Sequence, residues 1–218
     1  MKARVLLLVL LSSFSLLNAQ VIFDLPHEKN PKVSRFGASF QLGVMLASPT
    51  DINKFINNYV RTQIGNGIVV LDVGNENISS AVNFNFSPTI KFSKFIFRAM
   101  ADFAIASKSV TINSKEKRFS MIRFSPGLLL DRSFSIDDKK QFFAGAGVQY
   151  HFMSFENTPA NGVGGRIESG LRFRSLDDAM YSLFIMYDYA NQNTSTTTPG
   201  KVQSIDFSGI GLGARIEF

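Results

Sequence analysis

The chain closes on the stretch IGLGARIEF, residues 210–218. Apolar residues and Ala alternate there with Gly and charged residues, so one face of an extended strand is apolar and the other carries Arg215 and Glu217. A final strand with this period that stops on an aromatic residue is typical of bacterial outer-membrane β-barrels, in which apolar side chains face lipid and polar ones face the lumen. We expect Phe218 to be the C-terminal assembly signal for the barrel assembly machinery.

The start of the chain has the pattern of a secretory signal peptide. Lys2 and Arg4 precede an apolar run at 5–17, and a cleavage site follows Ala19. The apolar run is shorter than the ~20 residues that a membrane helix needs. We therefore expect export to the outer membrane. The expected division is a signal peptide at 1–19, an N-terminal periplasmic segment at 20–32 and an outer-membrane β-barrel domain at 33–218.

The amino-acid composition argues against several classes of site. The chain has no Cys, which rules out disulfides, thiolate metal sites and a thiol nucleophile. Its formal net charge of +6 is dispersed along the sequence, which does not indicate nucleic-acid binding. The sequence shows no cluster of metal ligands, and we expect no cofactor.

Alternating apolar and polar residues recur between turn signals, which indicates β-strands. Each segment is long enough for the ~9–11 residues with which a tilted strand crosses a membrane. The expected fold is all-β, an eight-stranded antiparallel up-and-down transmembrane barrel with a short helix in the first external loop. The expected strands are 33–46, 78–92, 95–107, 118–131, 141–153, 164–175, 179–190 and 204–218.

The expected connections are long at one end of the barrel and mostly short at the other, as in outer-membrane barrels. The external loops are predicted at 47–77, 108–117, 154–163 and 191–203, and the internal turns at 93–94, 132–140 and 176–178.

The polar faces of these strands are strongly ionic. In a narrow lumen unpaired charges are unfavourable, so we expect pairs such as Arg98 with Asp102, and Arg166 or Arg172 with Glu168. A polar conduit for a small anion is the alternative. A soluble periplasmic barrel would instead turn these charges outward and the Phe-rich faces inward. The predicted lumen charge network is Arg35, Lys91, Arg98, Asp102, Arg123, Arg166, Glu168, Arg172, Asp188, Arg215 and Glu217.

Apolar residues with helical spacing follow Ser48 and Thr50, either of which would cap a helix over 50–64. This helix either covers the barrel mouth or the outer-leaflet surface, or it docks a partner. The loop 48–77 is the best candidate for a partner-binding surface. The candidate partner-binding residues are Ile52, Phe55, Ile56, Tyr59 and Val60.

The stretch 123–130, RFSPGLLL, is followed by a charged turn and by 142–150, FFAGAGVQY. This hairpin resembles the outer-membrane β-barrel proteins common in Bacteroidota, including the PorT-like proteins, with an architecture similar to the OmpX and OmpA barrels. The resemblance covers most of 33–218 and implies an eight-stranded barrel. It also implies varied functions, among them accessory roles in protein secretion.

We expect a non-enzymatic structural or accessory outer-membrane protein, held by outer-membrane lipid, whose external loops bind a protein partner or ligand. A small-solute channel and a lipid-modifying enzyme are the alternatives. His151, followed by Ser154 and Glu156, is the one His in the predicted barrel, and we interpret it as part of the polar lumen. The aromatic residues expected at the membrane interfaces are Phe92, Phe95, Phe152, Phe155, Tyr181 and Tyr189.

Overall fold

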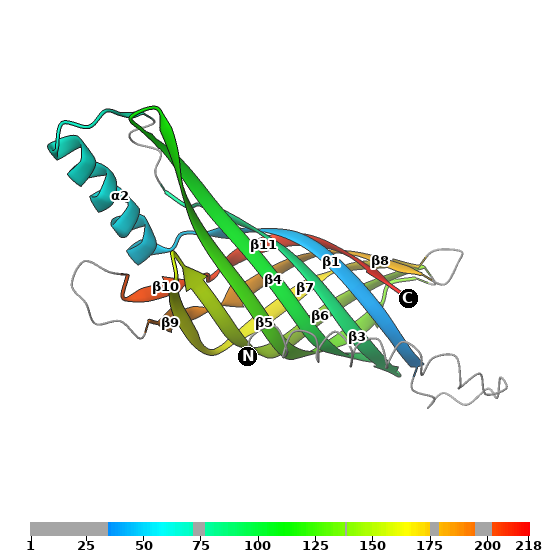
Figure 1. Cartoon of the computed structure of the whole chain (residues 1–218). Helices are drawn as coiled ribbons and strands as arrows, with labels where there is room; N and C mark the ends of the chain where they lie inside the picture. The colour runs from blue at the N-terminus through cyan, green and yellow to red at the C-terminus, as the bar shows by residue number, and fades with distance from the viewer. Residues whose placement is uncertain (1–34, 72–76, 138, 175–178, 195–201) are drawn as a thin grey trace.

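The computed structural model describes residues 35–71, 77–137, 139–174, 179–194 and 202–218. Within them the chain forms a closed antiparallel barrel of eight strands, with one helix between the first two barrel strands (Figure 1). The predicted barrel and helix are confirmed, whereas the predicted signal peptide and the 20–32 segment lie outside the described residues. The barrel strands are β1 (Arg35–Ala47), β3 (Ser80–Phe92), β4 (Phe95–Ile112), β5 (Lys115–Ser135), β6 (Lys140–Phe155), β7 (Thr158–Arg174), β8 (Met180–Tyr189) and β11 (Gly209–Glu217).

Each barrel strand pairs with the next one along the chain, and the first closes on the last. In β1 and β11, Gly43 lies opposite Gly213 and Val44 opposite Leu212. Closure leaves no edge strand in the barrel, so its ladder hydrogen bonds are satisfied within the ring. The remaining elements are the helix α2 (Thr50–Gly65) and the short strands β2 (Val70–Leu71), β9 (Asn191–Asn193) and β10 (Ser204–Asp206). No helix in the described ranges has the length and apolarity to cross a membrane.

The two ends of the barrel differ, and we call them the helix end and the turn end. The helix end carries α2 and a hairpin of β4 and β5 that projects beyond the other strands (Figure 1). The turn end carries the short connection at Ser93-Lys94, the connection between β5 and β6, of which 136, 137 and 139 are described, and Phe218.

The hairpins at the helix end correct two of the predicted loops. The 108–117 and 154–163 segments are mainly strand, and the chain reverses at Asn113-Ser114 and Glu156-Asn157, all four with positive φ as tight hairpin turns require. The predicted internal loop 132–140 is also shorter, because β5 runs on to Ser135. Within the projecting 108–117 segment the apolar residues are Val110 and Ile112, so the alternation is too short to identify a strand from the sequence.

The predicted final strand 204–218 is divided. Its first part, β10, pairs with β9 in a separate two-stranded ribbon. Between β10 and β11 the Phe207 N–H donates to the Ala190 carbonyl (2.8 Å) and the Phe207 side chain turns into the barrel, fully buried.

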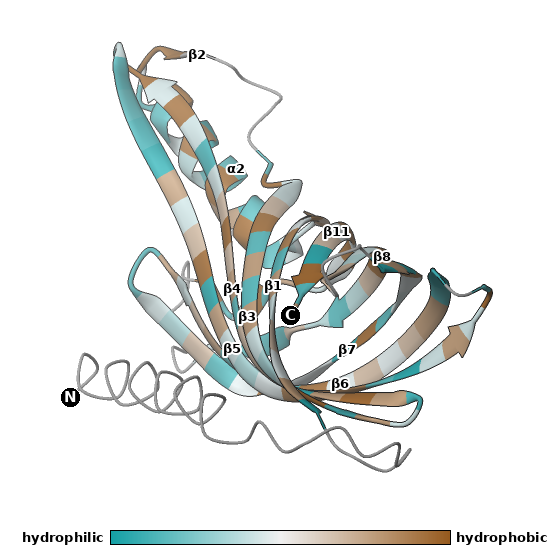
Figure 2. Ribbon diagram, turned by 90° about the vertical axis from the view of Figure 1, so that its right-hand side faces the viewer, coloured by the Kyte–Doolittle hydropathy of each residue, from teal (hydrophilic) through white to brown (hydrophobic). Residues whose placement is uncertain are grey.

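The period-two pattern sorts the side chains as predicted for the membrane barrel. Leu42 and Leu212 are more than half exposed on the outer surface, whereas Arg98 and Arg215 are at most 4% exposed inside. Figure 2 shows apolar and polar positions alternating along the strands. The soluble alternative, with Phe-rich faces inside and charges outside, is wrong for the described barrel.

Aromatic residues form a row across four neighbouring strands on the outer surface. Phe84 lies opposite Phe103, Phe103 opposite Phe124, and Phe124 opposite Phe152, with ring centroids 5.1, 4.6 and 6.2 Å apart. Such cross-strand aromatic pairs stabilise a sheet and fix its register. Phe155 does not join the outer aromatic residues as predicted, because it faces inward and is buried.

Helix α2 lies beside the projecting hairpin and packs its apolar face on the barrel (Figure 1). Phe55 contacts Phe119 and Phe155 in edge-to-face geometry, with centroids 6.4 and 5.7 Å apart. Asn53 fixes the helix by exchanging two hydrogen bonds with the Ile78 backbone, at 3.1 and 2.8 Å. The N-cap is Pro49, and neither Ser48 nor Thr50 caps with its side chain as predicted.

Ring closure can be tested with an engineered disulfide, because the natural chain has no Cys. Val44→Cys combined with Leu212→Cys joins residues that face each other across β1 and β11. Paired strand positions lie within the Cα separation that a disulfide bridges. We expect oxidation to link the pair within one chain, detected by mass spectrometry after digestion. Val44→Cys with Leu183→Cys, which are not partners, should remain reduced, and equal linkage of both pairs would contradict the register.

Candidate functional site

The barrel interior holds the main concentration of chemistry-bearing side chains. Five arginines and five carboxylates point inward, and each residue is at most 4% exposed. They divide into two groups along the barrel axis. The helix-side cluster is Asp102, Arg123, Arg166 and Asp188, and the turn-side cluster is Arg98, Asp131, Glu168, Arg172, Arg215 and Glu217.

The helix-side cluster is a closed square of two arginines and two aspartates. Arg123 Nη2 lies 2.7 Å from both Asp102 Oδ2 and Asp188 Oδ2. Arg166 donates to Asp188 through Nε and Nη2, at 2.5 and 2.7 Å, and its Nη2 lies 3.0 Å from Asp102 Oδ1. Each arginine contacts both carboxylates. With two arginines and two aspartates, the cluster is electrically neutral.

The turn-side cluster is balanced in the same way, with three arginines and three carboxylates. Arg98 donates to Glu217 Oε1 (2.6 Å) and contacts Asp131. Arg215 donates to Glu168 Oε1 (2.6 Å), and Arg98 also lies 3.5 Å from that oxygen. Arg172 is 3.3 Å from Asp131 Oδ2 and 3.2 Å from Glu217 Oε1.

Aromatic rings cover the faces of these guanidinium groups. The Phe143 centroid lies 4.5 Å from Arg172 Cζ, and the Phe184 centroid lies 4.6 Å from Arg215 Cζ. A ring face attracts a cation and excludes water, so these phenylalanines stabilise the charged groups while filling the lumen.

The predicted ion pairs within β4 and β7 are wrong, although their members do face inward. Arg98 and Asp102 are four residues apart on β4, which separates their Cα atoms by ~13 Å along the strand. Arg166 pairs with Asp102 and Asp188, and Arg172 with Asp131 and Glu217, in place of Glu168. The partners come from other strands instead, some of them adjacent, as with Arg166 and Asp188, which lie opposite each other on β7 and β8.

Two predicted network members lie at the margin. Lys91 is half-buried, with Nζ 3.9 Å from Glu217 Oε2, and Arg35 is exposed at the turn end. Asp131 was not predicted as a member of the network. It lies an even number of positions from Arg123 and Ser125 on the same strand, which places its side chain inside the barrel. Gly145 lies opposite Asp131, and a Cβ there would collide with the Asp131 carboxylate. The missing side chain therefore makes room for the cluster.

His151 and Ser125 form a hydrogen-bonded pair inside the barrel, with Oγ and Nδ1 2.7 Å apart. His151 Nε2 lies 3.1 Å from the Tyr189 carbonyl, so in the neutral ring Nε2–H donates to that oxygen and Nδ1 accepts the serine hydroxyl. The geometry resembles a nucleophile and its base. Both residues are fully buried, however, and Ser154 and Glu156 do not belong to the pair.

The five candidate partner-binding residues line the inner face of α2. Ile52, Ile56 and Val60 are at most 2% exposed, and Phe55 and Tyr59 pack against the same apolar cluster. That cluster fills the barrel interior at the helix end, with Met45, Met186 and Phe207 among its members. A partner would therefore meet the opposite face of α2 unless the helix lifts away.

No family model and no curated protein matches the sequence. Among solved structures, Neisserial surface protein A, an eight-stranded outer-membrane barrel, aligns with a TM-score of 0.56 at 11% identity, over 85% of this chain and 98% of that one. OprG from Pseudomonas aeruginosa follows with a TM-score of 0.47 at 13% identity, over 86% and 98% of the two chains. AlkL gives 0.46 at 13% identity, over 89% and 94%.

The first of these similarities shows a shared fold, and the weaker two add nothing to it. The resemblance to the PorT-like proteins of Bacteroidota remains a prediction.

The neutrality of the helix-side cluster gives a stability prediction. Asp188→Asn leaves two arginines facing one carboxylate, and breaking a buried ion pair from one side lowers the free energy of unfolding by about 3–5 kcal/mol. Arg166→Met combined with Asp188→Leu retains the neutral Arg123–Asp102 pair and should recover most of that loss. Urea unfolding of the refolded protein, monitored by circular dichroism, measures the free energy of unfolding of both variants.

Glu116→Gln is the matched control, because Glu116 is exposed on the projecting hairpin. It should unfold like the wild type. An Asp188→Asn protein as stable as this control would show that the cluster contributes nothing to stability.

Proposed function

We propose that the protein is a non-enzymatic outer-membrane barrel, a closed lipid anchor that displays its helix end to the cell exterior. One observation carries this proposal: the strands present apolar side chains outward while the buried charges are turned inward. A continuous apolar exterior of this extent is unfavourable in water and favourable in lipid.

Both ends of the barrel support the orientation. Outer-membrane barrels have short periplasmic turns and longer external connections. The turn end carries the short connection at Ser93-Lys94 with no further element, whereas α2 and the projecting hairpin extend the chain beyond the barrel at the helix end. Aromatic side chains suited to a membrane interface ring the turn end, namely Phe36, Phe92, Phe134, Phe142, Tyr181 and Phe218, each between 41% and 62% exposed.

The filled interior favours an anchor over a channel or an enzyme. An eight-stranded barrel is just wide enough for side chains, and here ion clusters and an apolar cluster occupy the lumen one above the other. A channel requires a continuous water path, and catalysis requires substrate access to Ser125 and His151, which are buried.

The projecting hairpin is the best surface for a protein partner. On β5, pairing with β6 begins at Met121, whereas pairing with β4 extends to Lys115. The outer edge of 115–120 thus has no strand partner among the described residues, and such an edge can accept an added strand. The exposed face of α2, including Lys54 and Arg61, lies at the same end.

Site-specific labelling in intact cells tests location and orientation together. Lys115→Cys places a thiol near the hairpin tip and Lys94→Cys one at the turn end, each as the single Cys of the chain. A membrane-impermeant maleimide should label Lys115→Cys in intact cells and Lys94→Cys only after the outer membrane is permeabilised. Labelling of Lys94→Cys alone in intact cells would contradict the orientation, and recovery of the protein outside the outer-membrane fraction would contradict the location.

A further inference from the structure

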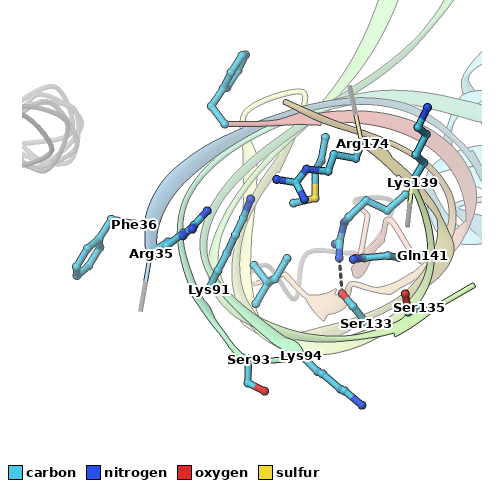
Figure 3. Close-up of a pocket in the computed structure, with 14 residues that line it drawn as sticks. Arg35, Phe36, Lys91, Ser93, Lys94, Ser133, Ser135, Lys139, Gln141 and Arg174 are labelled. Carbon is cyan, nitrogen blue, oxygen red and sulfur yellow. Dashed lines mark hydrogen bonds between the residues drawn. The ribbon is translucent and has the colours of Figure 1, made fainter. Parts of the chain in front are cut away.

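A cavity of ≈ 470 Å³ opens at the turn end of the barrel (Figure 3). Arg172 of the turn-side cluster lines it, together with residues of several strands, the turn at 93–94 and Lys139. Among the described residues that line it there is no Asp or Glu side chain. The basic residues lining it are Arg35, Lys91, Lys94, Lys139, Arg172 and Arg174.

Among the described residues, the carboxylates nearest the cavity already accept hydrogen bonds or ion pairs from other groups. Glu217 lies 2.6 Å from Arg98 and 3.2 Å from Arg172, so Lys91, at 3.9 Å, adds a positive charge to a cluster that is neutral without it. Asp137, in the adjacent turn, accepts the backbone N–H groups of Lys139 and Lys140 at 2.8 and 2.7 Å and thereby holds the turn. The charged side chains among the described lining residues are therefore all basic.

The polar groups in the cavity are oriented before any ligand arrives. Arg172 donates to Ser133 Oγ (2.6 Å), which leaves the serine hydroxyl hydrogen to donate to another acceptor. The Phe143 ring and two carboxylates hold the same guanidinium in place. Figure 3 shows Lys91, Gln141 and Ser133 directed into the ring of strands. Fixed donors of this kind lose little freedom when they bind an anion.

We propose that this cavity is a binding site for phosphate groups. Guanidinium and ammonium groups together with hydroxyl and amide donors match phosphate oxygens, and arginine recognises them in two-pronged geometry. In the proposed orientation, on which this step rests, the turn end lies at the periplasmic side, so the phosphate belongs either to a soluble compound of the periplasm or to a phospholipid headgroup of the inner leaflet. This site is at the opposite end of the barrel from the display surface.

Inorganic pyrophosphate is the probe for the soluble source, titrated calorimetrically into the full refolded protein in phosphatidylcholine nanodiscs. The same nanodiscs with and without phosphatidylglycerol test the headgroup source through the protein's thermal unfolding. The variants are Lys91→Gln and Arg35→Gln, and the matched control is Lys115→Gln at the far end of the barrel. Arg35 is exposed and lies outside both ion clusters. Arg35→Gln should therefore fold, and it still tests the proposal if Lys91→Gln does not fold.

We expect pyrophosphate to bind with one site per chain, and each cavity variant to weaken it about tenfold at low salt while Lys115→Gln binds like the wild type. If pyrophosphate does not bind but phosphatidylglycerol raises the unfolding temperature, and both cavity variants abolish that rise, the phosphate is a headgroup. Absence of both effects would overturn the proposal. Equal weakening by Lys115→Gln would also overturn it, because net charge alone would then explain the binding.

Discussion

The structure depends on pairing arginines with carboxylates inside a lumen too narrow to hold bulk water. A strand that turns apolar side chains to lipid must turn its alternate positions inward, and in this chain those positions carry ten ionised residues. Buried charges are tolerated only when they are paired and hydrogen-bonded. The chain meets this condition twice, with two arginines against two aspartates and, nearer the turn end, three arginines against three carboxylates.

The clusters also connect the register of the sheet to the closure of the lumen. Their members come from β4, β5, β7, β8 and β11, so a shift of one strand by a single residue would move its charge to the lipid side. The same arrangement depends on Gly145, which leaves space for the Asp131 carboxylate. The rings of Phe143 and Phe184 cover the guanidinium faces of Arg172 and Arg215. At the helix end the apolar face of α2 replaces charge as the filling. The interior is thus closed by different means along its length.

The strand number, the outward and inward faces and the existence of α2 were predictable from period and turn signals. The ion-pair partners of each charged residue were not predictable, because alternation along a strand shows only whether a side chain points inward or outward. Arg98 and Asp102 share a face of β4, yet Arg98 pairs with Glu217 on β11 and Asp102 with Arg123 on β5 and Arg166 on β7. The long β4–β5 hairpin was missed because its tip has too few apolar residues for a clear alternation, although Val110 and Phe119 pack in the same apolar cluster as α2. The burial of Ile52 and Ile56 could not be predicted, because amphipathicity shows that a helix has an apolar face but not what that face packs against.

Electrical recording across a planar lipid bilayer shows whether these side chains seal the barrel. The refolded wild-type protein should insert without producing conductance steps, under conditions in which a porin reference produces them. Insertion is verified separately by the labelling of Lys115→Cys from one side only. Regular, reproducible steps from the wild-type protein would contradict the account, because they would require a continuous water path through the ion clusters.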